Sequence, residues 1–136
     1  MCNLSKKISF GKKAIYALGN LAAKDPELRN DILKASALRP LLDIVEKSHN
    51  IQLVQGGTWA LSKFIRTNPL PRFEEVMEAI PILSKIIQET HDSDTLVEAA
   101  WTLFRFSGLY VEQVLEANVS AGLVAQIKQA LFKLFF

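Results

Sequence analysis

Apolar side chains recur along this chain at the three- and four-residue spacing of amphipathic helices, and one such phrase occurs three times. The copies cover residues 15–21, 58–64 and 100–106, and each has an aromatic residue in its second position. Trp59 follows Tyr16 by 43 residues, and Trp101 follows Trp59 by 42. Because a period of about 40–47 residues in a helical chain is typical of stacked helical repeats, the pattern predicts a solenoid.

Prolines and glycines divide each period into a short, a medium and a long helix. The predicted helices cover about residues 9–23, 25–35, 38–47, 52–66, 73 onward, 81–90, 94–108, 111–117 and 122–135. This triplet is typical of armadillo repeats rather than of two-helix HEAT units. We therefore predict an all-α fold, an armadillo-repeat right-handed superhelical solenoid. As a single array over residues 1–136, it would comprise a third helix (about 9–23), repeats over about 25–66 and 70–108, and a truncated repeat over about 110–136.

Both ends of this array are expected to be incomplete. The first long helix has no two helices before it, and the last unit has no third helix. Terminal repeats normally need a polar cap, which the LFKLFF sequence at Leu131–Phe136 does not supply. We therefore expect a piece of a longer array that, when made alone, is marginally stable or self-associates through its uncapped ends.

A helical wheel places the three aromatic residues away from the predicted core. At about 100° per residue, the positions two before, two after and five after each ring lie roughly opposite it. The nine predicted core residues are Ala14, Leu18, Leu21, Gly57, Leu61, Phe64, Ala99, Leu103 and Phe106. The rings are then expected to form a surface ladder with rungs about 8–10 Å apart, the packing distance of neighbouring helices. Since aromatic faces attract lysine and arginine, the ladder predicts a binding surface for extended basic peptides.

Composition and charge narrow the functional classes. A net charge of only +2 provides no strong field, so we expect neither nucleic acid nor a membrane as a partner. The single cysteine, Cys2, excludes an internal disulfide and favours a reducing compartment. His49 and His91 lie one repeat apart in predicted loops, so we expect no catalytic residues, no metal site and no cofactor. A basic cluster near the start is expected to be a solvated face; its members are Lys6, Lys7, Lys12 and Lys13.

Three longer stretches carry a family resemblance. They are AIYALGNLAAKDPELRNDIL at Ala14–Leu33, TWALSKFIR with NPLPRFEEVMEAIPIL from Thr58, and VEAAWTLFRFSGL at Val97–Leu109. Their tryptophan phrases, proline break and helix lengths resemble the middle of importin-α, the armadillo adaptor that carries nuclear localisation signals. The resemblance extends from about Phe10 to Gly122. It implies a non-enzymatic adaptor that binds an extended cargo peptide and occurs in cytoplasm and nucleus. An importin-β-like carrier is expected only through a longer form with a basic N-terminal arm.

The resemblance also implies site residues. In that family a tryptophan and, four residues later, an asparagine on each long helix hold the lysine stems and the backbone of the peptide. The implied peptide-binding residues are Tyr16, Asn20, Trp59, Ser62, Glu98 and Trp101. The positions that depart from the family pattern are Lys13, Lys24, Gly56, Lys63 and Arg105. Because most departures add positive charge, we expect this surface to bind ordinary basic signals weakly. Either its residues have drifted, or the surface now receives an acidic or phosphorylated segment.

An alternative function remains open at this point. The same fold could serve as an armadillo scaffold for another protein–protein interaction of a junctional, cytoskeletal or signalling kind. The charge of the ligand, and a basic arm in the full-length product, would distinguish the two.

Overall fold

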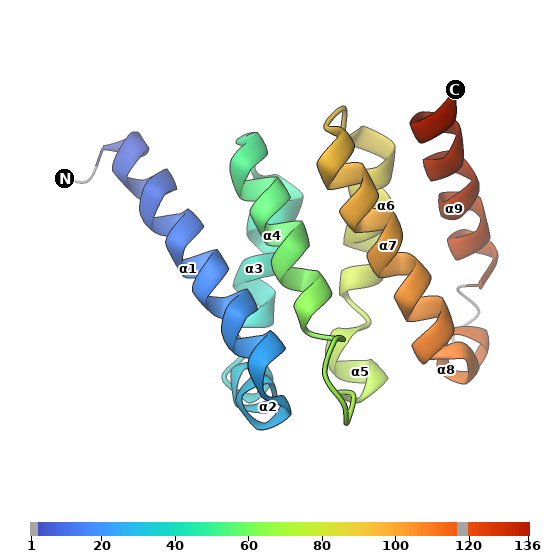
Figure 1. Ribbon diagram of the computed structural model, residues 1–136, viewed down its shortest axis with the longest axis horizontal. Helices are drawn as coiled ribbons and strands as arrows, with labels where there is room; N and C mark the ends of the chain where they lie inside the picture. The colour runs from blue at the N-terminus through green and yellow to red at the C-terminus, as the bar shows by residue number, and fades with distance from the viewer. Residues whose placement is uncertain (1–2, 117–119) are drawn as a thin grey trace. The chain divides into compact units, whose positions relative to one another are not determined.

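The computed structural model describes residues 3–116 and 120–136, and every regular element within them is a helix (Figure 1). The predicted all-α armadillo-repeat fold is confirmed. The chain divides into two compact units, Met1–Pro71 and Arg72–Phe136. A single array over residues 1–136 stays a prediction.

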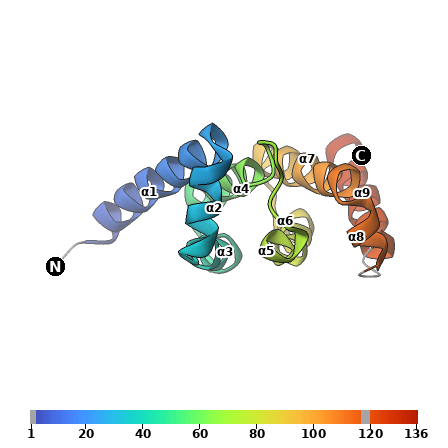
Figure 2. The same cartoon turned by 90° about the horizontal axis from the view of Figure 1, so that it is seen from below.

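The first unit contains α1 (Leu4–Lys24), α2 (Pro26–Lys34), α3 (Leu38–Lys47) and α4 (Ile51–Lys63). Helices α1 and α4 lie side by side, and α2 and α3 form a second layer against them (Figures 1 and 2). Local sequence explains where these helices begin. The side chains of Asn3, Asp25 and Asn50 accept hydrogen bonds from backbone N–H groups of the first turn. Pro26 follows its cap at a position where the missing N–H has no intrahelical partner to lose.

Two helix ends in this unit differ from the prediction. Helix α1 begins five residues earlier than expected, because Asn3 caps it. Helix α4 ends at Lys63 rather than near Arg66. The N–H groups of Phe64 and Arg66 donate to carbonyls only three residues back, which tightens the chain into a turn. Phe64 is 1% exposed and Ile65 is 0% exposed, so this tight turn places two large apolar side chains in the core.

A buried arginine holds the segment that follows α4. Arg29 of α2 is 0% exposed. Its guanidinium donates to the carbonyl oxygens of Thr67 at 2.6 Å and Pro69 at 2.5 Å, and to the Thr67 hydroxyl at 3.2 Å. Because the guanidinium is planar and rigid, these bonds fix residues 67–69 against α2.

Glycines allow α4 to lie close to both of its neighbours. A Cβ on Gly19 of α1 would lie 2.5 Å from Cζ3 of Trp59. A Cβ on Gly57 would overlap Cγ2 of Val45 on α3, and Gly56 faces α1. Gly57 therefore serves close packing against α3, whereas a Cβ at Gly56 would make only ordinary contacts with Ile15 and Tyr16 of α1.

The core prediction is correct for α4 and α7 and wrong for α1. Gly57 and Leu61 of α4, Phe64 directly after it, and the three predicted positions on α7 are buried. On α1, however, Leu21 is 45% exposed and Ala14 is also exposed, whereas Ile15, Gly19 and Ala22 are buried. Helix α1 packs mainly against α4 and α2, which cover the face containing these three residues. A wheel drawn from one helix alone does not show where its neighbours lie.

The second unit contains α5 (Phe73–Val76), α6 (Ala79–Glu89), α7 (Ser93–Leu109), α8 (Val111–Glu116) and α9 (Ser120–Phe135). Helix α7 packs between α6 and α9 (Figure 1). These helices lie within about two residues of the predicted ranges; the expected helix end at Ala117 falls outside the described residues. None of the described helices combines the length and apolarity that crossing a bilayer requires.

Candidate functional site

The first candidate surface is formed by α1 and α4, where two aromatic rings meet. The ring centroids of Tyr16 and Trp59 are 5.3 Å apart, and the planes are tilted by 55°. Tyr16 is 43% exposed and Trp59 is partly buried. Gly19 makes this arrangement possible, because a side chain there would occupy the place of the indole. Tyr16 therefore lies on the surface as predicted, whereas Trp59 is only partly exposed.

One lysine contacts this ring pair, and others lie further along the same two helices. The Nζ of Lys63 lies 5.0 Å from the Trp59 ring centroid, one turn further along the same helix. An ammonium at this distance is attracted by the ring face, so a lysine of this chain already occupies one side of the indole. At the other end, Lys12 of α1 donates through Nζ to Oε1 of Gln52 on α4 at 3.1 Å. The exposed Lys13 places its Nζ 5.7 Å from the Phe10 ring centroid.

The remaining predicted site residues of the first unit differ in how exposed their side chains are. Asn20 and Lys24 are exposed on α1, where a ligand can reach them. Gly56 is buried against α1. Ser62 is only 6% exposed, and its hydroxyl donates to the carbonyl oxygen of Trp59 at 2.6 Å. The burial of Ser62 disfavours its predicted contact with a peptide.

The second candidate surface lies on α7. Trp101 is 55% exposed, and its ring centroid lies 5.4 Å from that of Phe104, which is 57% exposed. Glu98 and Arg105, on the same helix, are partly buried. Sequence reasoning missed Phe104, although its spacing of three residues from Trp101 brings two side chains together on a helix surface. The third aromatic position is therefore a pair of exposed rings rather than a single one.

The chain is similar in sequence to known importin subunits alpha. No protein-family model matches the chain. It is 35% identical over 116 residues to importin subunit alpha-2 of Arabidopsis thaliana, which covers 83% of this chain and 22% of that protein. It is 33% identical to importin subunit alpha-1b of Oryza sativa subsp. japonica, with the same coverage. Importin subunit alpha-1 of Schizosaccharomyces pombe is 35% identical over 78% of this chain and 19% of its own length.

The chain is a relative of the importin-α family. It spans about a fifth of the length of these relatives. The importin-α resemblance noted from the tryptophan phrases is thereby confirmed.

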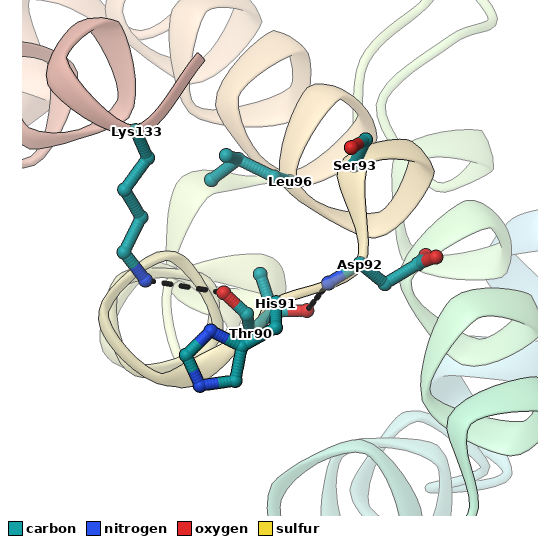
Figure 3. A pocket seen from close by; sticks show the side chains of 6 residues that line it. All are labelled: Thr90, His91, Asp92, Ser93, Leu96 and Lys133. Atoms are coloured by element: carbon teal, nitrogen blue, oxygen red, sulfur yellow. Dashed lines mark hydrogen bonds between the residues drawn. The ribbon is translucent and has the colours of Figure 1, made fainter. Parts of the chain in front are cut away.

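In the described part of this importin-α relative, a hollow of about 200 Å³ lies at the turn between α6 and α7 (Figure 3). Its lining residues are Thr90, His91, Asp92, Ser93, Leu96 and Lys133. Lys133 of α9 donates to the carbonyl oxygens of Ile87 at 2.5 Å, Gln88 at 2.7 Å and Thr90 at 3.2 Å. Such an ammonium satisfies the unpaired carbonyls at the end of α6 and is favoured by the helix dipole. Among the described residues, no group of three or more histidine, cysteine or acidic side chains could hold a metal.

Asp92 begins α7 beside this hollow. The Thr95 hydroxyl donates to Oδ2 of Asp92 at 2.6 Å, and the Thr95 N–H donates to the same oxygen at 2.9 Å. The hydroxyl bond, followed by the backbone bond, lowers the pKa of Asp92 from its ordinary value. The cap therefore stabilises the fold above about pH 4 and loses its contribution as the pH falls through the lowered pKa.

Replacing Asp92 with alanine is expected to lower the free energy of unfolding at pH 7 by about 1 kcal/mol, the usual effect of losing an N-cap. Since the variant lacks the titrating carboxylate, its stability should fall less between about pH 5 and pH 3 than that of the wild type. Urea denaturation across this pH range measures both effects. Ser93→Ala, one residue later and exposed, removes no titrating group and should keep the wild-type pH dependence. Parallel pH curves for wild type and Asp92→Ala would contradict the prediction.

Proposed function

We propose that this chain is part of a non-enzymatic adaptor of the importin-α type, which binds an extended segment of a cargo protein for import into the nucleus. The observation that carries the proposal is the recurrence of aromatic rings on the long helices α1, α4 and α7, exposed at Tyr16 and Trp101 and partly buried at Trp59, in a chain that is 30–35% identical to importin subunits alpha. Tyr16, Asn20 and Trp59 would contact the peptide in the first unit, and Glu98 and Trp101 in the second. The protein would work in cytoplasm and nucleus, with an importin-β-like carrier recruited through a longer form.

The lysines on these helices imply weak binding of ordinary basic signals. A peptide lysine that approaches the Trp59 ring meets the ammonium of Lys63, which lies 5.0 Å from the ring centroid. Two positive charges about 4 Å apart repel by about 1 kcal/mol in water and about 4 kcal/mol at an effective dielectric near 20. Since about 1.4 kcal/mol corresponds to a tenfold change in affinity, this repulsion is sufficient to weaken binding strongly. Arg105 would act in the same sense beside Trp101.

The proposal is tested by restoring the amide groups that the resemblance implies. The combined variant Lys63→Asn with Arg105→Asn is expected to bind a lysine-rich peptide at least about tenfold more tightly than the wild type. Fluorescence anisotropy of a labelled peptide measures this, with Lys34→Asn combined with Lys47→Asn, on α2 and α3, as a control that also removes two positive charges. Sub-micromolar binding of the lysine-rich peptide by the wild type would exclude the weakened surface. Unchanged affinity in the double variant would count against binding at the ring surfaces.

A further inference from the structure

Charge is distributed unevenly between the two layers of the first unit. Helices α1 and α4 carry six lysines and neither aspartate nor glutamate. The lysines are Lys6, Lys7, Lys12, Lys13, Lys24 and Lys63. Helices α2 and α3 instead carry four acidic and four basic side chains. The modest net charge of the whole chain therefore conceals a purely cationic layer, and this layer contains the Tyr16–Trp59 ring pair.

The cations lie on both sides of the rings along the helix axes. Lys12 reaches the level of Gln52, with which it forms a hydrogen bond, and Lys63 stands eleven residues beyond Gln52 on α4. At about 1.5 Å of rise per residue, these two levels are about 16 Å apart, and the two rings lie between them. An extended peptide advances about 3.3 Å per residue, so this distance corresponds to four or five residues.

The chemistry of the surface favours a peptide over a nucleic acid. All cations of α1 and α4 are lysines, whereas bidentate recognition of phosphate favours arginine, which these helices lack. Asn20 is exposed on α1, and its amide has donors and an acceptor that suit a peptide backbone. The exposed face of Tyr16 offers apolar area for one aromatic or long aliphatic side chain.

We propose that the α1–α4 surface docks an acidic peptide segment, in which two carboxylates four or five residues apart flank an aromatic or aliphatic side chain. This rests on the proposed function, because it takes the ring surface to be a peptide-binding one. The carboxylates pair with lysines on either side of the rings, and the central side chain packs on Tyr16. Lys63, which weakens basic ligands, here becomes a contact of the ligand.

The probe is a labelled peptide of about twelve residues with glutamates on either side of a central phenylalanine. Its binding to the full chain is measured by fluorescence anisotropy. Binding is expected at about 50 mM salt and should weaken at least about fivefold at about 300 mM, since the Debye length shortens. Lys63→Gln should weaken binding about three- to fivefold, the range of one exposed charge pair. Lys34→Gln makes the same charge change on α2 and should have no effect. The peptide with glutamines in place of glutamates should not bind.

Three results would overturn the inference: equal binding of the glutamine peptide, equal effects of Lys63→Gln and Lys34→Gln, or tighter binding of a single-stranded oligonucleotide than of the acidic peptide at the same salt. Failure here is distinguishable from failure of the proposed function. Suppose that Lys63→Asn with Arg105→Asn gains affinity for the lysine-rich peptide but the wild type does not bind the acidic peptide. The adaptor function is then supported and the acidic ligand is excluded. If instead the acidic peptide binds through Lys63 and the asparagine variant gains no affinity for the lysine-rich peptide, the docking surface is supported and the importin-type function is excluded.

Discussion

Replacing Arg29 with methionine is expected to lower the free energy of unfolding by about 3 kcal/mol, since hydrogen bonds from a charged donor contribute about 1.5–3 kcal/mol each. The guanidinium is fully buried and donates to the carbonyl oxygens of Thr67 and Pro69. Methionine fills most of the volume but donates nothing, so these carbonyls lose their partner. Urea denaturation followed by tryptophan fluorescence measures the change as a shift in midpoint.

The chain contains a matched control for this substitution. Arg39 on α3 forms an exposed ion pair with Asp43 at 2.9 Å, four residues along the same helix. Exposed pairs of this kind contribute about 0.3–0.5 kcal/mol, so Arg39→Met should have a small effect. Equal destabilisation by the two variants would show that Arg29 contributes no more than a surface arginine.

Replacing Gly19 with valine is expected to destabilise the first unit by about 3 kcal/mol, at the upper end of the usual range for overpacking. A Cβ there would lie 2.5 Å from the edge of the Trp59 ring and 3.2 Å from the backbone Cα of Ala60. The ring could move, but the backbone of α4 could do so only by separating from α1. We therefore expect a lower urea midpoint together with a red-shifted emission of Trp59 as its ring becomes more exposed.

Gly108 is the control position for the Gly19→Val substitution. It is helical and exposed, and a Cβ there would meet nothing within 4 Å. Gly108→Val should change stability by less than about 0.5 kcal/mol, because the modest helix-propensity gain of valine over glycine is the main term. If Gly19→Val and Gly108→Val behave alike, close packing at Gly19 does not hold the rings in place.

Most helix boundaries were predictable because their causes are local. Asn50 and Asp92 each precede an apolar periodic segment, and Pro26 follows its cap directly. The end of α4 was not predictable in this way, since the burial of Phe64 and Ile65 depends on distant parts of the chain. The same holds for α1, whose buried face is set by α4 and α2 rather than by its own apolar pattern.

The site was predictable in part for similar reasons. The rings of Tyr16 and Trp101 could be placed on the surface from one wheel, and the contact of Lys63 with Trp59 follows from a spacing of four residues. The pairing of Tyr16 with Trp59 joins two helices, so no single-helix pattern contains it. The role of Ser62 was carried over from a family resemblance, which does not report that this hydroxyl is turned toward its own helix.

The two adjacent glycines of α4 have a mechanical consequence. Gly56 faces α1, while Gly57 faces α3. At this level the backbone of α4 lies against side chains of both neighbours, Val45 and Leu41 on α3 and Ile15 and Tyr16 on α1. Because packed interiors transmit strain, a small sideways movement of α3 would pass through α4 to α1 with little loss. We therefore expect the Tyr16–Trp59 ring pair to shift when α3 shifts. The position of the rings would then report how closely the helices of this unit pack.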